Sequence, residues 1–144
     1  MADRTDDDDA LRALLGTRRR IAVVGASPDP ERASHRIFRF LHDMGHDVLP
    51  VNPVAPEVAG VACVPDLDAA KAHWGAPPEV VDVFRAPHHL PAIVAQTMDA
   101  GADWLWLQLG VVHEDAIGEA LDAGLDVVVD RCILIEARRL GVQL

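Results

Sequence analysis

Residues 19–34, RRIAVVGASPDPERAS, combine apolar, small and charged residues in an order that suits the binding of phosphate. The apolar run 21–24 predicts a strand that is buried on both faces, as in a parallel sheet. Gly25, Ala26 and Ser27 follow at once, and such small residues let a ligand approach the main chain closely. Free N–H groups at a turn or at a helix N-terminus favour an anion, so we expect this turn to hold a phosphate group.

The same turn departs from the pattern of a dinucleotide site. A nicotinamide dinucleotide turn reads G-x-G-x-x-G, but Ser27 and Pro30 stand two and five positions after Gly25. Such a domain also places an acid at the end of its second strand, roughly 20 residues further on, where it bonds the ribose hydroxyls. Asn52 and Pro53 occupy that place, and a proline ring offers a flat apolar surface to a base. We therefore expect phosphate binding without a standard nicotinamide site.

Other residue types that carry chemistry form no catalytic or metal-binding pattern. The seven histidines show no H-E-x-x-H spacing, and the two cysteines, Cys63 and Cys132, form neither C-x-x-C nor a disulfide framework. Ser27 lacks the G-x-S-x-G setting of a hydrolase nucleophile. We therefore expect no metal ion and no catalytic residue in this chain.

Charge and hydropathy exclude several classes of partner. A net charge of −10 argues against nucleic acid or an anionic membrane as the main partner. It also opposes any phosphate ligand, so local arginines would have to overcome the general field. No apolar run approaches the roughly 20 residues that span a bilayer, and the N-terminus has no apolar signal-peptide core. We expect a cytoplasmic protein with no membrane partner.

A repeated pattern predicts the elements that position these residues. Segments 45–49, 101–105 and 124–128 each read Gly-x-Asp followed by apolar residues, and an amphipathic stretch with helical spacing precedes each one. Glycine fits the position just past a helix end, so the repeated unit is helix, tight turn, buried strand. Together with strands at 21–24 and 80–84, this alternation predicts a three-layer α/β/α Rossmann-like domain with a mainly parallel sheet of five or six strands.

The remaining segments fit around this sheet. Residues 61–64 predict a short strand at an edge, and we interpret residues 21–144 as a single domain because no linker divides them. Residues 1–20 are expected to form a tail and a packing helix, with the first few residues disordered. An interaction tail is the alternative, but acid before a leucine stripe and base after it suit a helix dipole. The residues concerned are Asp6 to Asp9, Leu11, Leu14, Leu15 and Arg18 to Arg20.

The ends of the predicted strands define a candidate ligand site. In an open parallel sheet the ligand lies beyond the carboxyl ends of the strands, near the point where the strand order reverses. The residues there are largely small, amide, aromatic or basic. In chain order they are Gly25, Ala26 and Ser27; Asn52 and Pro53; Phe84 and Arg85; Gln108, Leu109 and Gly110; and Asp130, Arg131 and Cys132.

Five segments at these strand ends resemble the stand-alone CoA-binding proteins, a family whose domain is similar to the CoA-binding part of the succinyl-CoA synthetase α subunit. The resemblance covers residues 21–140. The segments are AVVGASPDPERAS, VLPVNP with the later EVAG, VDVFR, WLQLGV and VVVDRCILIEARRL. Each motif is weak alone, but five in order at the expected strand ends are specific.

The resemblance implies a role for most of the candidate residues. It implies that the turn 25–27 cradles the pyrophosphate of coenzyme A (CoA) and that Asn52 and Pro53 border the adenosine. It further implies that Phe84 and Arg85 flank the cofactor. Contacts from Arg32 and Ser34 are implied as well.

This chain departs from its relatives in two ways. Many of them follow the Asn-Pro pair with lysine, whereas this chain has Val54, so one expected cation is absent. The synthetases carry a phosphorylated histidine in a second domain that this chain does not have. The resemblance therefore does not imply ligase activity.

Several candidate residues also have a plainer structural interpretation. Arg32 and Arg85 would pair with surface carboxylates if they bind no ligand, although a guanidinium at a strand end suits bidentate phosphate contact. Ser34 equally fits the N-cap of a helix that begins nearby. Gln108 and Gly110 would then only end their strand. Two further expectations concern Trp104 and Trp106, which suit the core better than a stacking platform, and Cys132, which suits burial better than a redox role.

The sequence therefore predicts a protein that binds coenzyme A or an acyl-CoA as its small-molecule ligand, in a binding or regulatory role without chemistry of its own. Two alternatives stay open. One is a subunit of an enzyme that acts on CoA thioesters, which would need a catalytic partner chain or a thiol role for Cys132. The other is a module that senses NAD or another adenine nucleotide, and the missing glycine and acid count against it.

Overall fold

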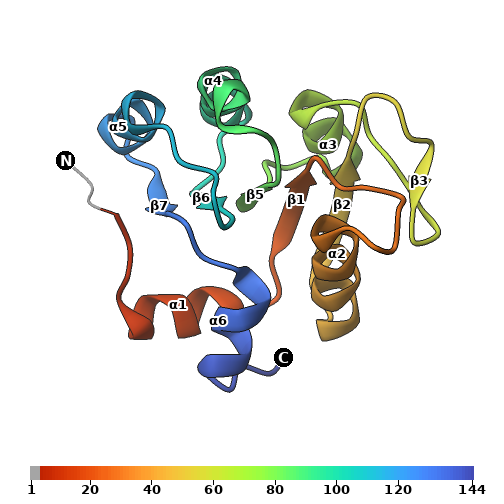
Figure 1. The fold of residues 1–144 in the computed structure, drawn as a ribbon, viewed down its shortest axis with the longest axis horizontal. Coiled ribbons are helices and arrows are strands. Elements are labelled where there is room, and N and C mark those ends of the chain that lie inside the picture. Colours follow the sequence, from red (N-terminus) through yellow and green to blue (C-terminus); the bar gives the residue numbers. More distant parts are fainter. Residues whose placement is uncertain (1–3) are drawn as a thin grey trace.

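A computed structural model describes residues 4–144; residues 1–3, where we expect disorder, lie outside the described residues. Five strands form one sheet in the order β2-β1-β5-β6-β7, and every neighbouring pair is parallel (Figure 1). This confirms the predicted mainly parallel Rossmann-like sheet. The strands are β1 (Arg20–Val24), β2 (Asp47–Val51), β5 (Val80–Val83), β6 (Trp104–Leu107) and β7 (Asp126–Val128).

Helices cover both faces of the sheet and give the three layers. Three helices lie above the sheet in Figure 1: α3 (Leu67–Trp74), α4 (Leu90–Ala100) and α5 (Glu114–Asp122). Three others lie below it: α1 (Asp8–Leu15), α2 (Ala33–Met44) and α6 (Ile133–Arg139). The apolar residues of the upper helices and of the lower helices belong to two separate core clusters, one on each face of the sheet.

Two of the repeated glycines end helices as the sequence predicts. Gly45 follows α2 with φ 110°, and Gly101 follows α4 with φ 79°, so both adopt the left-handed conformation that glycine tolerates. In the third unit the cap of α5 is Ala123, and Gly124 lies one residue beyond it. The chain therefore turns from helix into buried strand within a few residues, which leaves the opposite, carboxyl ends of the strands to carry the longer loops.

The predicted edge strand at 61–64 needs correction. Residues Val61–Ala62 form β4, which pairs antiparallel with β3 (Glu57–Val58) in a separate two-stranded hairpin. Ala59 and Gly60 between them have positive φ angles of 50° and 82°, which fold the chain back on itself. Just after the hairpin, Val64 forms a parallel bridge with Val51 of β2, and Val58 packs into the lower core cluster.

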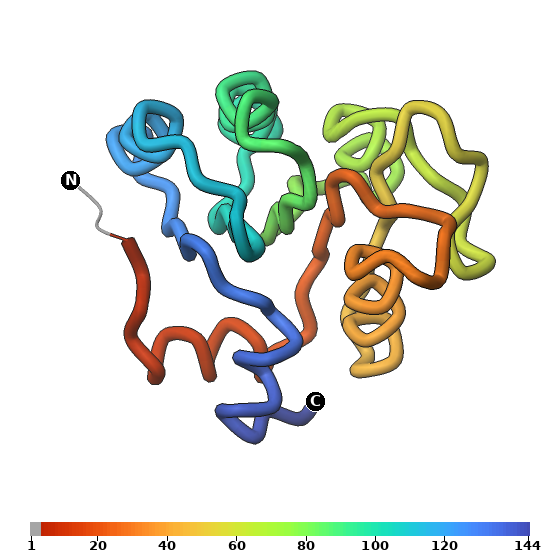
Figure 2. Tube along the Cα trace, viewed as in Figure 1, coloured from red at the N-terminus to blue at the C-terminus, as the bar shows by residue number. Residues whose placement is uncertain are grey.

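The N-terminal helix α1 packs against the lower core. Asp7 accepts the N–H of Asp9 at its start, and Leu11, Leu14 and Leu15 are buried. Arg139 of α6 binds the Asp8 carboxylate at 2.7 Å, and the trace in Figure 2 shows these two helices side by side. The leucine stripe thus packs as predicted, whereas the division at residue 20 stays a prediction.

A short N-terminal segment also pairs with the sheet. Arg4 forms a parallel bridge with Val127 of β7, and the Thr5 N–H donates to the Val127 carbonyl at 2.8 Å. This segment lies beside the outer strand β7. Among the described residues, no helix has the length and apolar character that crossing a membrane requires.

Candidate functional site

The strand order reverses at β1, which has β2 on one side and β5 on the other. After β1 the chain passes below the sheet into α2, whereas after β5 it passes above the sheet into α4 (Figure 1). Loops that diverge in this way leave a crevice between the carboxyl ends of the two strands, where open α/β sheets bind their ligands. The topology therefore selects the ends of β1 and β5 as the centre of the site.

Gly25, at the end of β1, lies in close contact with the end of β5. Its φ is +87°, and a Cβ built on it would lie 2.8 Å from the Phe84 carbonyl oxygen and 3.0 Å from Cδ of Arg85. The Gly25 N–H donates to the carbonyl of Val51 in β2 at 3.0 Å. Only glycine fits here, because both the φ angle and the neighbouring backbone exclude a side chain.

The turn after Gly25 is held by hydrogen bonds of its own. The Ser27 N–H donates to Oγ of Ser34 at 3.1 Å, and Oγ of Ser27 accepts the N–H of Asp29 at 3.1 Å. Ala26 is fully buried in the lower core, so its side chain is not available to a ligand. These bonds fix the shape of the turn.

The structure excludes the N-cap interpretation of Ser34. Arg32 is the cap residue of α2 and makes no side-chain capping bond, while Ser34 is the second residue of the helix. The first N–H groups of a helix have no partner within the helix. Ala33 and Ser34 carry two of them and line a hollow of about 250 Å³ whose other lining residues are Gly25, Ser27, Arg32 and Phe84. This phosphate hollow thus combines helix N–H groups, hydroxyls and one arginine.

A second hollow, of about 210 Å³, opens on the other side of Gly25. Its walls are mostly apolar, and four of the lining side chains are polar. We call it the adenosine hollow, because the family resemblance implies that Pro53, one of its lining residues, borders the adenosine. It is lined by Val24, Gly25, Val51, Pro53, Pro65, Asp66, Arg85, His89, Ala92, Ile93 and Gln96.

Asn52 and Pro53, after β2, differ in what they offer to a ligand. Nδ2 of Asn52 donates to the Ala26 carbonyl at 2.9 Å, and its Oδ1 accepts the N–H groups of Val54 at 2.9 Å and Ala55 at 3.0 Å. The amide therefore ties the β2 loop to the β1 turn. Pro53 is exposed and lines the adenosine hollow. Val54, where relatives have lysine, is 89% exposed and supplies no cation.

Arg85 joins a histidine that the sequence analysis did not single out as a ligand. Nη2 of Arg85 lies 3.0 Å from Nε2 of His89, which ends the short 3₁₀ helix η1 (Pro87–His89). Both residues line the adenosine hollow. Loss of hydration lowers the pKa of His89, and electrostatic interactions with Arg85 and His88 lower it further. In the sequence, the available sign of this contact was that His89 follows Arg85 by four residues, with Pro87 between them.

The predicted site residues after β6 lie apart from both hollows. Nε2 of Gln108 donates to Oδ1 of Asp82 at 2.6 Å, and the Gly110 N–H donates to Oδ1 of Asp130 at 2.7 Å. Neither residue lines the phosphate hollow or the adenosine hollow. Their groups are used within the protein, and a ligand role for them stays a prediction.

Asp82 is a buried acid that the sequence analysis missed. It is fully buried in the middle of β5, and its second oxygen, Oδ2, has no hydrogen-bond partner among the described residues. Burial raises the pKa of Asp82 from 3.8 to about 7, and the hydrogen bond from Gln108 opposes this rise. A single acid within the apolar run VVDVF was the available signal.

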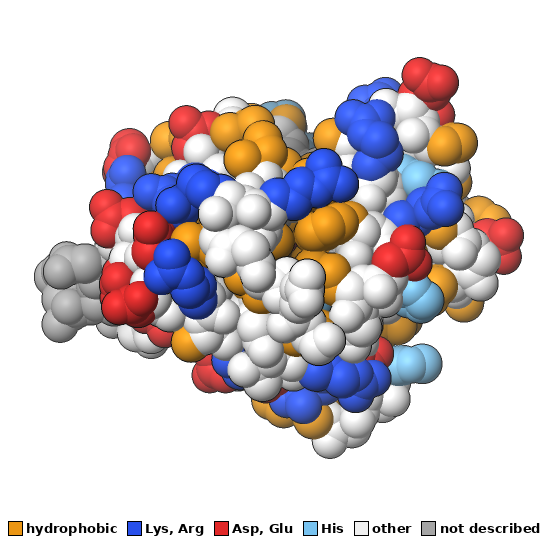
Figure 3. Space-filling view, turned by 90° about the horizontal axis from the view of Figure 1, so that it is seen from below, with side chains coloured by type: hydrophobic (Ala, Val, Ile, Leu, Met, Phe, Trp, Pro, Cys, Tyr) orange, Lys and Arg blue, Asp and Glu red, His pale blue; other side chains and the backbone are white. Residues whose placement is uncertain are grey.

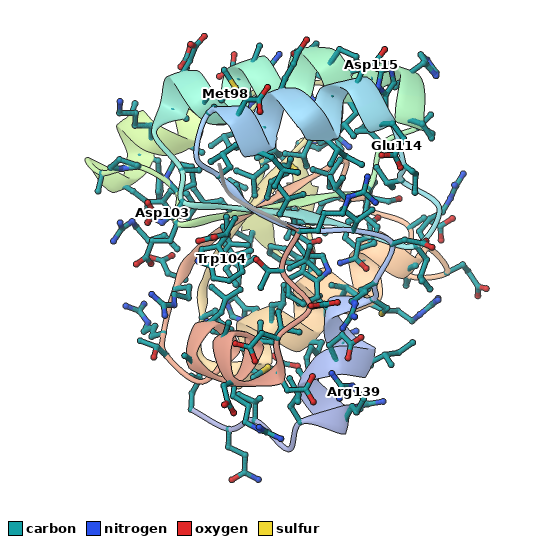
Figure 4. The ribbon with its side chains drawn as sticks, turned by 90° about the vertical axis from the view of Figure 1, so that its left-hand side faces the viewer. Met98, Asp103, Trp104, Glu114, Asp115 and Arg139 are labelled. Atoms are coloured by element: carbon teal, nitrogen blue, oxygen red, sulfur yellow. The ribbon has the colours of Figure 1, made fainter. Side chains whose placement is uncertain are left out.

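The remaining candidates support the core. Trp106 is buried and its Nε1 donates to the Arg131 carbonyl at 2.9 Å, while Trp104 packs against the same lower cluster. Figure 4 views the sheet from the side and shows Trp104 directly beneath it. Cys63 and Cys132 are partly buried and free. Within residues 4–144, no group of three or more His, Cys, Asp or Glu side chains is placed to hold a metal ion.

A separate hollow of about 540 Å³ lies below the sheet, between α2 and α6. Figure 3 looks at this side of the molecule, where basic and apolar side chains interleave. The Arg138 guanidinium stacks over the Phe40 ring, 5.6 Å from its centre. Arg36 and Arg39 line the same hollow, which also reaches Pro30 in the turn after β1.

Comparison with known proteins identifies the family of this chain. Residues 19–138 match the model of the family described as CoA binding domain. The chain belongs to this CoA-binding family. Membership supports binding of CoA in general, and the matched segment includes all the strand ends described above.

Relatives of similar size occur in bacteria and archaea. Uncharacterized protein YneT of Bacillus subtilis is 34% identical over 125 residues, which cover 87% of this chain and 90% of YneT. A solved structure of a hypothetical protein from Pyrococcus horikoshii has a TM-score of 0.87 at 36% identity, covering 98% of each chain. One from Thermus thermophilus has a TM-score of 0.86 at 37% identity, covering 93% of this chain and 98% of that one. Chains of this size and fold therefore recur in the family.

Proposed function

We propose that this protein binds coenzyme A or an acyl-CoA across the carboxyl ends of β1, β2 and β5. The observation that carries the proposal is the contact of Gly25 with Phe84 and Arg85, which brings two hollows together at the point where the strand order reverses. Family membership supports CoA as the ligand.

The phosphate hollow suits the pyrophosphate of CoA. Ala33 and Ser34 carry free helix N–H groups, and the positive end of the α2 dipole favours an anion there. Arg32 lies beside them and is exposed, so it can close over a bound phosphate. Ser34 already accepts the Ser27 N–H, so its hydroxyl hydrogen remains free to donate to the phosphate.

The adenosine hollow suits the base and its ribose. Pro53 and Pro65 offer flat apolar surfaces, and Gln96 and Asp66 are polar groups that can distinguish the edge of a base. Arg85 stands at the boundary with Gly25, where its guanidinium can bind a phosphate of the ligand. Because net charge is −10, such local cations must supply the attraction.

NAD fits this arrangement less well. An NAD domain has a carboxylate at the end of its second strand to bond the ribose. In this chain that place holds Asn52, whose amide is engaged by Ala26, Val54 and Ala55. We therefore propose that CoA is preferred over NAD.

The proposed role is binding or regulation rather than catalysis. Arg85 and His89, which line the adenosine hollow and contact each other, can bind a phosphate. Neither hollow places a hydroxyl or thiol nucleophile in a hydrogen bond with a histidine or carboxylate that would activate it. A signal carried by the bound state would then be read by another protein.

Thermal melts with CoA, NAD and ADP test the proposal. Ligand at 100 times its dissociation constant stabilises a protein by roughly 2.7 kcal/mol, which for a domain of this size raises Tm by several degrees. We expect CoA to raise Tm at lower concentration than NAD or ADP does. A larger shift with NAD than with CoA at equal concentration would overturn the proposal.

A further inference from the structure

The hydrogen bond between Arg85 and His89 fixes the protonation of the histidine. Arginine has N–H donors and no acceptor, and it keeps its proton at every ordinary pH. At the 3.0 Å contact, Nε2 of His89 must therefore be the acceptor, with no hydrogen of its own. While this hydrogen bond is formed, His89 is neutral.

The groups around His89 favour its neutral form. Arg85 at the end of β5 and His88 on the same 3₁₀ helix both disfavour the imidazolium, and they lower the pKa of His89 together with partial burial. The ring of His88 lies 4.1 Å from that of His89, centre to centre. Asp66, the N-cap of α3, is the carboxylate that lines the same hollow, and its Oδ1 already accepts the Ala69 N–H. Gln96 of α4 is uncharged.

A phosphate bound beside Arg85 would favour the protonated form of His89 instead of the neutral one. Its oxygens accept from the Arg85 guanidinium more strongly than an imidazole nitrogen does, because the hydrogen bond then joins opposite charges. Nε2 of His89 would lose its donor and face an anion. Protonation turns the nitrogen into a second donor to the same phosphate, and the added negative charge favours the imidazolium.

We propose that His89 is a phosphate-binding residue of the CoA site and takes up a proton when the ligand binds. This inference rests on the proposed function and adds to it a ligand residue and a proton linkage. CoA binding should then weaken as the pH rises. In the limit of one proton per ligand, the dissociation constant rises about tenfold per pH unit.

Calorimetry in buffers of different ionisation enthalpy measures the proton directly. We would titrate CoA into the protein at pH 7 in phosphate-free PIPES and Tris, and obtain the number of protons taken up from the dependence of the heat on the buffer. His89→Gln keeps an acceptor for Arg85 but cannot be protonated. We expect proton uptake by the wild type, little uptake by His89→Gln, and an affinity for CoA that is weaker in this variant by about fivefold or more.

A matched control and a second ligand remove other sources of protons. His73 is an exposed histidine near the end of α3, and His73→Gln should keep the wild-type uptake. The 3′-phosphate of CoA itself titrates near pH 6, so we would repeat both titrations with dephospho-CoA. Dephospho-CoA lacks this phosphate. Uptake with CoA alone assigns the 3′-phosphate to His89, uptake with both ligands assigns the pyrophosphate, and either result supports the proposal.

The two levels of the hypothesis fail in different ways. Equal proton uptake by wild type and His89→Gln would overturn the role of His89 while CoA binding stands. No heat and no thermal stabilisation with CoA in the wild type would instead overturn the proposed function. Circular dichroism and a melting curve of His89→Gln verify that the variant is folded.

Discussion

The carboxyl edge of the sheet has two halves that use similar residues differently. At the ends of β1 and β5, Gly25 and Arg85 border hollows, and the turn leaves helix N–H groups exposed. At the ends of β6 and β7, Gln108 is bound to Asp82 and Gly110 to Asp130. Each half offers a glycine, a polar side chain and an arginine.

The difference lies in what engages the polar groups at each strand end. After β6 the chain passes above the sheet into α5 and after β7 it passes below into α6, yet the Asp130 carboxylate of the second loop binds the Gly110 N–H of the first. After β1 and β5 the chain also leaves in opposite directions, but there Gly25 and Arg85 border hollows. Polar residues at a strand end therefore serve a ligand only where no partner within the chain engages them. The following predictions test this contrast, from the largest expected effect to the smallest.

The two glycines give the largest contrast. In Gly25→Ala the new Cβ would lie 2.8 Å from the Phe84 carbonyl oxygen, whereas nothing lies within 4 Å of a Cβ at Gly110. We expect Gly25→Ala to abolish measurable CoA binding and to lower the free energy of unfolding by roughly 3–5 kcal/mol, from left-handed strain and overpacking. Gly110→Ala should lose only about 1–2 kcal/mol and bind CoA as the wild type does. Calorimetry and urea unfolding measure both, and equal CoA affinities of the two variants would contradict the contrast.

Asp82 predicts a dependence of stability on pH. Its pKa is raised from 3.8 to about 7 in the folded state, so between these values the folded protein holds a proton that the unfolded chain releases. The resulting stabilisation is complete below about pH 4 and is lost as the pH rises through 7, on the order of 4 kcal/mol in all. Asp82→Asn should remove this pH dependence from urea unfolding curves, and at pH 8 it should be the more stable protein.

Asp103→Asn serves as the control for Asp82, because Asp103 is an exposed acid just before β6. It should keep the wild-type dependence on pH. If Asp82→Asn shows the wild-type curve as well, then burial does not perturb this carboxyl as the structure indicates.

The two arginines give an intermediate contrast. Arg85 borders the adenosine hollow, whereas Arg131, after β7, pairs with Glu136 at 3.4 Å. A hydrogen bond to a charged group contributes about 1.5–3 kcal/mol, so Arg85→Ala should weaken CoA binding by about tenfold or more. Arg85→Lys should restore only part, because lysine lacks the planar fork. Arg131→Ala should change the CoA affinity by no more than about twofold. A larger loss of affinity in Arg131→Ala than in Arg85→Ala would indicate that CoA binds at the ends of β6 and β7 instead.

The smallest expected effect on binding is that of Gln108. Because its amide donates to buried Asp82, Gln108→Ala should change the CoA affinity by less than about twofold. At pH 6, where Asp82 is mostly protonated, the lost hydrogen bond should lower the free energy of unfolding by about 1 kcal/mol. A tenfold loss of CoA affinity with unchanged stability would show that Gln108 contacts the ligand after all.

Much of the fold follows from local sequence patterns. Glycine after an amphipathic stretch ends α2 and α4, and the buried strands follow within a few residues, so the elements and their alternation were predictable. The hairpin of β3 and β4 was not, because Ala59 adopts a positive φ that the sequence does not indicate. A non-glycine residue in that conformation depends on its surroundings.

The candidate site was predictable only in part. The approach of Gly25 to Arg85 could be expected from strand ends alone, but the engagement of Gln108 by Asp82 depends on two side chains facing each other from neighbouring strands. The spacing of residues along the chain does not predict which side chains of neighbouring strands face each other. His89 was missed for a related reason, since its contact with Arg85 depends on the 3₁₀ turn that begins at Pro87.

The pairing of Arg4 and Thr5 with Val127 has a consequence for the behaviour of the protein in solution. An outer strand with free backbone groups is a template on which another polypeptide can add, and proteins that leave such strands open tend to aggregate. Here a short parallel segment occupies part of β7 and α1 follows it, so the chain shields its own outer strand. Removal of residues 1–7 should therefore promote self-association through β7, and a purification tag is better attached at the carboxyl terminus.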